Sequence, residues 1–259
     1  MKEYQNWKVY SSNDVQFHMS PDKQGGMRVI ATVGPNKKEL CIITPECITQ
    51  WPKCTADGNY GTTYGPKEPS EEKKTKFTLD LTSKPITGAE NSQFTEFLAF
   101  ITAIDDKLLD FVTENQDKLI KKVGKLSREQ VKMLQNRSVK EKADAMTGTV
   151  DYKVIDLKRN KYTYESFGYQ AQNSITICDG EGALIEGGMV RSGDVIACTM
   201  WPSSVYTGLA GDKFGITWAF DAVSIICQGS KVAQSPQVSA FAGQAKSAYY
   251  APYEVPVDA

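Results

Sequence analysis

The sequence predicts a mainly β protein with inserted helices, and three observations support this prediction. Short runs rich in β-branched and aromatic residues recur in both halves of the chain, separated by glycine and proline turns, which is typical of strands. One long stretch between them repeats its apolar residues every three or four positions, as an amphipathic helix does. A late run changes the parity of its apolar residues, which indicates a strand that bends between two faces.

The first part of the chain is predicted to form strands and one long loop. Residues 27–33 and 40–43 are β-rich, and the segment 34–38, Gly-Pro-Asn-Lys-Lys, predicts a turn between them. Six glycines and prolines break the pattern over residues 51–72, and alternation at 77–81 returns the chain to a strand. Because loops beyond about 15 residues are usually functional or disordered, this loop is a candidate binding segment.

The long helix is predicted to begin at Ser92 and to pack its apolar stripe, which continues to Val112, on the core. A second, basic helical stretch follows, and Ser127 and Gln130 have the spacing of a capping box. The acidic residues of the long helix include Asp105, Asp106 and Asp110. We expect these carboxylates to form a solvated face rather than a metal site.

Strands return after Gly148, and the last of them covers residues 214–226. Its apolar residues keep one parity as far as Ala222 and the other from Val223 onward, which predicts a β-bulge or a bend. Strongly bent strands are how small Greek-key barrels close. We therefore predict an OB-fold-like, five-stranded Greek-key barrel, elaborated with one long and one short helix and extended loops.

The domain organisation follows from this pattern. Residues 1–228 are predicted to form a single OB-fold-like domain, with a helical insertion at about 90–145. Residues 229–259 are rich in Ala, Gln, Ser, Gly and Pro, which predicts a flexible C-terminal tail.

Composition excludes several classes of protein. The 259 residues are 41% hydrophobic and 24% charged, as in a globular protein. No apolar run approaches the roughly 20 residues of a membrane span, and the polar N-terminus does not resemble a signal peptide. The six cysteines lack the spacing of a disulfide framework, which favours a reduced, intracellular protein.

The residues of most enzyme classes are missing. His18 is the single histidine, and no Gly-rich phosphate loop is present, so we predict neither an enzyme nor a cofactor. Cys41, Cys47 and Cys54 are spaced more widely than the pairs of a structural zinc site, so no metal is predicted. The chain is expected to be a binding protein.

Charge is segregated along the chain. Residues 115–161 carry 13 basic and 6 acidic side chains, whereas residues 162–259 carry 4 and 9. A basic middle in a nearly neutral protein is consistent with an anionic ligand, and also with a solvated helix face plus a loop.

Three places mix aromatic with basic residues, the combination that binds single-stranded nucleic acid by stacking on bases and neutralising phosphates. The candidates in the long loop and just after it are Trp51, Lys53, Tyr60, Tyr64, Lys67, Lys73, Lys74 and Lys76. Those of a predicted basic hairpin with its tip at 158–161 are Tyr152, Lys153, Lys158, Arg159, Lys161, Tyr162 and Tyr164. The third place holds Trp201, Tyr206, Lys213 and Trp218.

Some of these aromatics have a structural alternative. Trp218 alternates with Ile216 and Phe220, which favours the core, whereas Trp201 fits the core and the surface equally well. The hairpin aromatics fit sheet packing as well as stacking. Stacking is favoured for Trp51, because a glycine-rich loop offers little local core.

The order of several short motifs resembles a known family. The helix from Phe94 to Asn115 leads to Leu126-Ser-Arg-Glu-Gln-Val131 and to Ser138-Val-Lys140, and the basic hairpin follows. Near the end, Gly193-Asp-Val-Ile196 precedes Lys213-Phe-Gly-Ile-Thr-Trp218. This order resembles the single-stranded-DNA-binding proteins encoded by large DNA viruses and, more distantly, those of some tailed phages.

The resemblance covers roughly residues 25–228. It implies an OB-fold core with an inserted helix, sequence-independent binding of single-stranded DNA, and a role in viral DNA replication, recombination or repair. It also implies an intracellular location at viral replication sites in the host nucleus or cytoplasm, with replication proteins or further copies of the chain as partners and no membrane. The phage proteins end in an acidic tail, but residues 253–259 here hold only two acidic side chains, so recruitment of partners by such a tail is not expected.

The leading hypothesis is therefore a protein that coats single-stranded DNA. The alternative is a viral structural or assembly protein that uses a β-barrel for protein–protein contacts, for which the Ala/Gln/Tyr composition of the tail would suit packing into a neighbour. A third reading, an enzyme acting on nucleic acid, lacks a catalytic constellation in the sequence.

Overall fold

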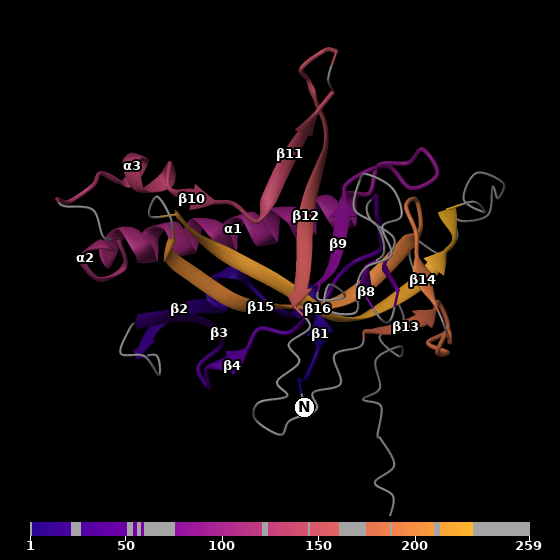
Figure 1. The fold of residues 1–259 in the computed structure, drawn as a ribbon, viewed down its shortest axis with the longest axis horizontal. Coiled ribbons are helices and arrows are strands. Elements are labelled where there is room, and N and C mark those ends of the chain that lie inside the picture. The colour runs from indigo at the N-terminus through magenta and orange to yellow at the C-terminus, as the bar shows by residue number, and fades with distance from the viewer. Residues whose placement is uncertain are drawn as a thin grey trace, which may run out of the picture.

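The structure is a computed structural model, and Figure 1 shows its elements. It describes residues 2–21, 27–50, 54–55, 58–59, 76–120, 124–144, 146–160, 175–186, 188–209 and 213–229. The helices are η1 (Trp7–Val9), η2 (Ser12–Asp14), α1 (Ser92–Glu114), α2 (Gln116–Leu119) and α3 (Arg128–Lys132). The strands are β1 (Gln5–Asn6), β2 (Val15–Pro21), β3 (Met27–Val33), β4 (Lys38–Glu39), β5 (Ile42–Ile43), β6 (Cys47–Ile48), β7 (Cys54–Thr55), β8 (Gly58–Asn59), β9 (Lys76–Thr82), β10 (Gln135–Asn136), β11 (Val139–Ala143), β12 (Val150–Asn160), β13 (Thr176–Asp179), β14 (Met189–Val190), β15 (Val195–Leu209) and β16 (Lys213–Cys227).

Five of the described strands close a ring, which confirms the predicted barrel. Going around the ring, β6 pairs with β9, β9 with β12, β12 with β16, β16 with β15, and β15 returns to β6. The β12–β16 pair is parallel, in register at Leu157 and Trp218, and the other four pairs are antiparallel. In chain order the ring strands are β6, β9, β12, β15 and β16. Going around the barrel, the first is followed by the second, the third, the fifth and the fourth. This order is that of a five-stranded Greek-key barrel of the OB type.

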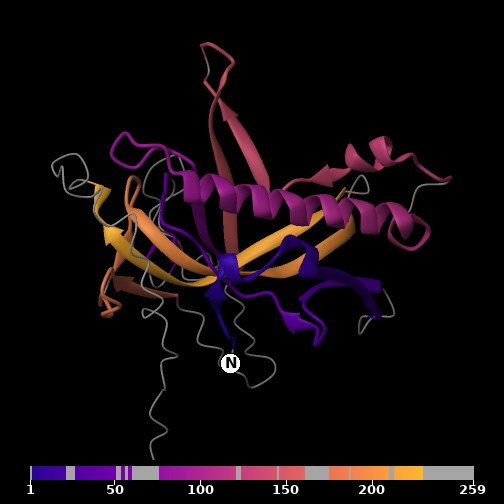
Figure 2. The same ribbon diagram turned by 180° about the vertical axis from the view of Figure 1, so that it is seen from behind.

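Helix α1 connects the second and third ring strands and lies along one side of the barrel, as Figure 2 shows. The Asn91 side chain caps its first turn by accepting a hydrogen bond from the Phe94 backbone N–H at 3.1 Å. The apolar stripe buries Phe94, Phe97, Ile101, Ile104 and Leu108 completely. The predicted long helix is confirmed, and so is the capping box that begins α3, formed by the side chains and backbones of Ser127 and Gln130.

The predicted bulge also forms. Met200 of β15 pairs with Phe220, and Cys198 pairs with Val223, so the register advances two residues on β15 and three on β16. Phe220 and Val223 are both buried. The change of parity in the sequence is therefore the point where β16 gains one residue and stays in contact with the core.

Two expectations about the middle of the chain are wrong. The end of the predicted helical insertion, residues 135–143, contains β10 and β11, because β11 finds a partner in β12 from Val139↔Ile155 to Ala143↔Val150. Residues 158–160, expected in the hairpin tip, instead continue β12 and pair with β9. The β11–β12 hairpin projects from the barrel, and its tip includes Asp144 and residues 146–149 (Figures 1 and 2).

Among the helices that the structure describes, none has both the length and the apolar character needed to cross a membrane. The predicted tail lies outside the described residues, apart from Gly229.

Candidate nucleic-acid interface

The sequence candidates divide into those that the structure describes and those outside it. The residues outside are Trp51, Lys53, Tyr60, Tyr64, Lys67, Lys73, Lys74, Lys161, Tyr162 and Tyr164. Lys76 and Arg159 are described as parts of strands, and the side chains of Lys153 and Lys158 are exposed.

Strand register brings the stems of the long loop and of the segment after β12 together. β9 begins at Lys76, directly after the loop, and β12 ends at Asn160, and these two residues are partners in the antiparallel pair. At the other stem of the loop, the Thr49 hydroxyl and the Gln50 N–H donate to Asp80 Oδ1 on β9, at 3.1 and 3.0 Å. Both aromatic, basic segments therefore start beside the β9–β12 pair, where paired strands lie about 4.8 Å apart.

A groove of about 490 Å³ opens next to Lys158. It lies between β10, β11, β12 and the β15–β16 hairpin. Its lining consists of Gln135, Asn136, Arg137, Ser138, Lys140, Asp156, Lys158, Tyr206, Ile216, Thr217 and Trp218. Three of these side chains are cationic and one is anionic, so the groove carries a positive excess that suits a phosphate backbone.

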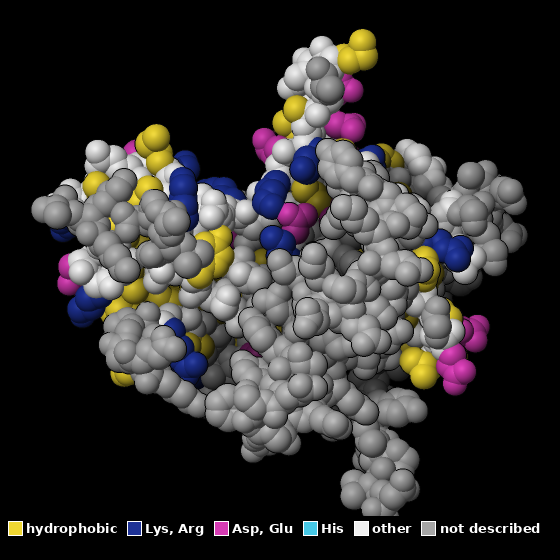
Figure 3. All heavy atoms as spheres, in the orientation of Figure 1, with side chains coloured by type: hydrophobic (Ala, Val, Ile, Leu, Met, Phe, Trp, Pro, Cys, Tyr) yellow, Lys and Arg dark blue, Asp and Glu magenta, His cyan; other side chains and the backbone are white. Residues whose placement is uncertain are grey.

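The cations of the groove are on or near the surface. Lys140 Nζ lies 2.5 Å from Asp156 Oδ2, and Arg137 Nη2 lies 2.6 Å from Asp106 Oδ1 on α1. Exposed ion pairs of this kind contribute about 0–1 kcal/mol, so exchanging a carboxylate for a phosphate costs little. Figure 3 shows Lys and Arg side chains gathered at the base of the projecting hairpin.

One wall of the groove depends on Gly215. Asn136 Nδ2 donates to the Tyr206 hydroxyl at 3.1 Å, and Tyr206 and Gly215 are cross-strand partners. A Cβ atom at Gly215 would lie 2.6 Å from the Asn136 carbonyl oxygen and 2.7 Å from the Tyr206 hydroxyl. Only glycine therefore lets the half-buried Tyr206 ring close over the strand.

The floor of the groove is held by a buried hydrogen-bond chain. Trp218 Nε1 donates to Ser138 Oγ at 2.8 Å, and this hydroxyl donates to Asp105 Oδ1 at 2.8 Å. The Ser138 N–H donates to Asp105 Oδ2 at 2.7 Å. Trp218 is 1% exposed, which confirms its predicted place in the core.

The prediction of a solvated acidic face on α1 is wrong for Asp105. Its side chain is 1% exposed, because the connection between β10 and β11 packs over that part of the helix. Burial raises the pKa of Asp105 to about 6, while the hydrogen bonds from Ser138 and the charge of Arg137 act in the opposite direction. Asp106 and Asp110 form exposed ion pairs with Arg137 and Arg128. The signal for Asp105 was present in the sequence, since it follows Ile101 by four residues within the apolar stripe.

The four residues of the third aromatic place, Trp201, Tyr206, Lys213 and Trp218, do not lie together. Tyr206 and Trp218 line the groove, whereas Lys213 Nζ donates to the Met133 carbonyl oxygen at 3.0 Å. Trp201 is 9% exposed and packs outside the main core. The Lys2 ammonium lies 3.1 Å from the centroid of its ring.

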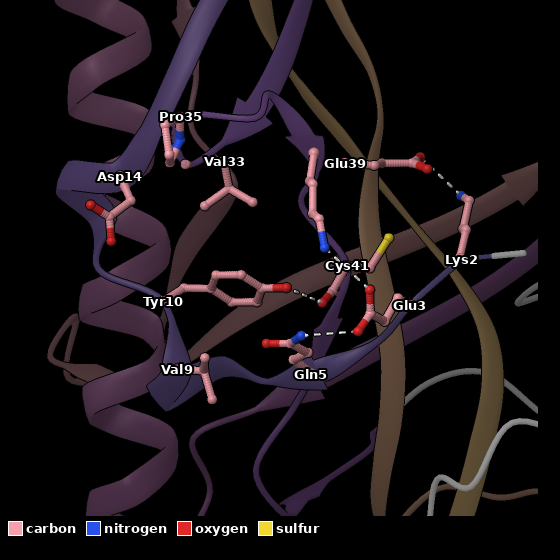
Figure 4. Close-up of a pocket in the computed structure, with 12 residues that line it drawn as sticks. Lys2, Glu3, Gln5, Val9, Tyr10, Asp14, Val33, Pro35, Glu39 and Cys41 are labelled. Atoms are coloured by element: carbon pink, nitrogen blue, oxygen red, sulfur yellow. Dashed lines mark hydrogen bonds and ion pairs between the residues drawn. The ribbon is translucent and has the colours of Figure 1, made fainter.

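A second groove, of about 540 Å³, lies near the N-terminus (Figure 4). Its lining includes the anions Glu3, Asp14 and Glu39 against the cations Lys2 and Lys38. The two lysines are ion-paired with Glu39 and Glu3, at 3.2 and 3.5 Å. This groove has an anionic excess and is a poorer site for phosphate than the groove beside Lys158. Within the described ranges, no group of three or more His, Cys, Asp or Glu side chains could hold a metal ion.

Sequence reasoning missed several residues of the basic groove. Arg137, Lys140 and Asn136 were not candidates, although they lie in the basic middle of the chain. Lys153 was a candidate, but it is absent from the groove lining and its ammonium lies 3.6 Å from Glu141 Oε1 across the hairpin.

Comparison with solved structures finds similarity to phage single-stranded DNA-binding proteins at low sequence identity. gp2.5, a single-stranded DNA binding protein encoded by bacteriophage T7, matches with a TM-score of 0.45 and 10% identity, over 72% of this chain and 91% of the phage protein. The single-stranded DNA-binding protein from bacteriophage Enc34 in complex with ssDNA matches with a TM-score of 0.35 and 13% identity, over 81% and 96%. No protein-family model and no curated protein matches the sequence. The fold is assigned from the strand order given above.

Proposed function

We propose that this protein binds single-stranded DNA without sequence preference, in viral DNA replication, recombination or repair. The binding surface would consist of the groove beside Lys158 and the two aromatic, basic segments whose stems adjoin it. Lysine and arginine side chains would neutralise phosphates, and aromatic rings would stack on bases. Replication proteins are the further partners that such a role would bring.

The observation that carries this proposal is the coincidence of charge and topology. In OB-type barrels, oligonucleotides bind on the second and third strands and on the loops joining the first to the second and the fourth to the fifth. Here β9 and β12 are the second and third ring strands, and the long loop joins the first to the second. The basic groove lies against β12 and the hairpin formed by the fourth and fifth strands.

The chemistry of the groove favours a flexible single strand over a duplex. Its cations line a trough closed on one side by Tyr206 and Asn136. A single strand can turn its bases toward aromatic rings, each stacked base contributing about 1–3 kcal/mol. A duplex keeps its bases stacked inside and offers only phosphates.

The test is a titration of fluorescently labelled oligo-dT, followed by anisotropy at several salt concentrations, with duplex DNA as competitor. We expect tight binding that weakens with salt and resists the duplex. Each phosphate contact to a single strand contributes about −0.7 to the slope of log K against log salt. The double variant Lys140→Gln/Lys158→Gln should therefore reduce the slope by roughly 1.4.

The matched control is Lys118→Gln, an exposed lysine on α2, which lies at the far end of the helical layer in Figure 1. It should leave the slope unchanged. Equal slopes for the groove variant and the wild type would remove the groove from the site. No binding by the wild type at low salt would remove the function and favour a structural or assembly protein.

A further inference from the structure

The β11–β12 hairpin has one face that continues the basic groove. Residues directly opposite in an antiparallel pair share a face, and so do residues two apart in a strand. Lys142 is paired with Tyr152, and Lys140 with Val154. Asp156 and Lys158 follow at two-residue steps. We call Lys140, Lys142, Tyr152, Asp156 and Lys158 the groove face of the hairpin, since three of these residues line the groove.

The strand register that defines the groove face is continuous from the barrel to Tyr152, and the buried Val154, which pairs with Lys140, lies on this face between Asp156 and Tyr152. The register of β12 with β9 is regular over residues 154–160. The β11–β12 register is regular from Val139 to Lys142 and shifts only between Lys142 and Ala143. Tyr152 lies six residue steps along β12 from Lys158, which corresponds to about 20 Å at roughly 3.3 Å per residue.

Tyr152 has the surroundings of a base-stacking residue. Its ring is half-buried, and the Lys84 ammonium lies 4.4 Å from the ring centroid. Lys142, its cross-strand partner, is exposed. An aromatic ring flanked by two cations is the arrangement that stacks a base and neutralises the adjoining phosphate.

The opposite face and the tip have different chemistry. On the opposite face, the one lysine, Lys153, is paired with Glu141, so this face lacks the positive excess that three lysines and one aspartate give to the groove face. The tip region holds Asp144 and Asp151, both exposed. A phosphate backbone would be attracted along the groove face and repelled at the tip, so Tyr152 and Lys142 lie at the outer end of the cationic path.

We propose that the bound single strand leaves the barrel groove and continues along the groove face of the β11–β12 hairpin, where a base stacks on Tyr152 and Lys142 and Lys84 contact its phosphates. This inference rests on the proposed function and deepens it. The hairpin would lengthen the binding site beyond the barrel by the reach of a few nucleotides.

The experiment compares oligo-dT of increasing length, from about 6 to about 30 nucleotides, since OB-type sites cover roughly 4–16 nucleotides per barrel. For the wild type, affinity should rise with length until the oligonucleotide covers both the barrel groove and the groove face of the hairpin. Tyr152→Ala should weaken binding of the longest oligonucleotides by about 5- to 150-fold, as expected for one lost stack, and leave the shortest unchanged. Tyr152→Phe, which keeps the ring, should behave as the wild type.

Lysine variants on the two faces provide the matched comparison. Lys142→Gln should lower the salt slope for long oligonucleotides only, by roughly 0.7, whereas Lys153→Gln on the opposite face should not change it. Thermal melting of each variant checks that the fold persists.

The possible failures are distinguishable. If the wild type binds and Tyr152→Ala has no effect, or weakens short and long oligonucleotides equally, the hairpin path is overturned while the barrel site stands. If the wild type binds no oligonucleotide of any length, the proposed function fails and the hairpin path fails with it.

Discussion

At the scale of single residues, Asp105 is the side chain that links helix α1 to the groove by hydrogen bonds. Asp105 accepts two hydrogen bonds from Ser138, and Ser138 Oγ accepts one from Trp218. The helix, the β10–β11 connection and strand β16 thus meet at one carboxylate. Ser138 lies between Arg137 and the strand that carries Lys140, so the position of both cations depends on this buried group.

The first prediction concerns Asp105 and pH. Its native pKa of about 6 lies above the unfolded value near 3.8, so between these values the native state binds more protons than the unfolded state. The free energy of unfolding should therefore fall as pH rises through this window, by about 3 kcal/mol for a shift of about two units.

Asp105→Asn removes the titration. Its free energy of unfolding, relative to that of the wild type, should rise from about pH 4 to about pH 7, as measured by urea unfolding at both values. A difference that is the same at both pH values would show that Asp105 does not titrate in this window.

At the scale of elements, the β11–β12 hairpin is unusual because it projects beyond the strands that support it. Among the described residues, Ser83 holds the base of the hairpin, because its N–H donates to the Lys153 carbonyl and its hydroxyl accepts from the Lys153 N–H. One residue further out, the Lys84 ammonium lies over the Tyr152 ring. Beyond this point the ribbon has two strands, and two-stranded ribbons are marginal in water. Its end exposes 94% of Met146.

The turn at the tip of the hairpin is stabilised by hydrogen bonds to Asp144. Asp144 Oδ1 accepts hydrogen bonds from the backbone N–H groups of Met146 and Thr147 and from the Thr147 hydroxyl, at 2.9, 2.8 and 3.1 Å. Gly148 takes the positive φ of 69° that closes the turn. The Asp144 side chain therefore accepts hydrogen bonds from backbone N–H groups of the turn, as a capping residue does at the start of a helix.

The second prediction is that Asp144→Ala loosens the hairpin without unfolding the barrel. Amide hydrogen exchange of residues 140–152 should accelerate at least about tenfold, which corresponds to about 1.4 kcal/mol of local stability, while the amides of α1 keep their protection. Asp144→Asn, which can still accept these bonds, is the control. Unchanged exchange in the alanine variant would show that the strands alone order the ribbon.

At the scale of the whole molecule, closure of the ring is what assembles the candidate site. The loop after β6 and the segment after β12 are more than 80 residues apart in the chain, yet their stems meet because β9 and β12 are paired. The groove itself takes residues from β10, β11, β12, β15 and β16.

The third prediction tests this convergence through Trp51, which stays a sequence candidate. Trp51→Ala should weaken binding of single-stranded DNA by a stacking increment of about 1–3 kcal/mol, with little change in melting temperature. Trp218→Ala is the contrasting variant, because it should destabilise the fold by about 3–5 kcal/mol. A large loss of stability in Trp51→Ala with unchanged binding would assign Trp51 to the core.

The elements whose signals are local could be predicted from the amino-acid pattern. Helix α1 follows from apolar spacing, the start of α3 from the pair Ser127 and Gln130, and the bulge in β16 from the parity change after Ala222. The OB-type barrel was predicted from these elements and the strands around them, because a strongly bent strand is how a small Greek-key barrel closes.

Contacts between polar residues depend on long-range packing that no local pattern shows. Asp105 is buried because the segment 135–138 folds over α1, and the periodicity of a helix cannot show what covers it. Lys153 and Lys158 have opposite surroundings because strand faces alternate and only the pairing with β9 and β11 fixes which face adjoins the groove. Arg137 and Lys140 join Tyr206 across about 70 residues of chain, and contacts between residues so distant in the chain depend on strand register, which is decided by packing of the complete ring.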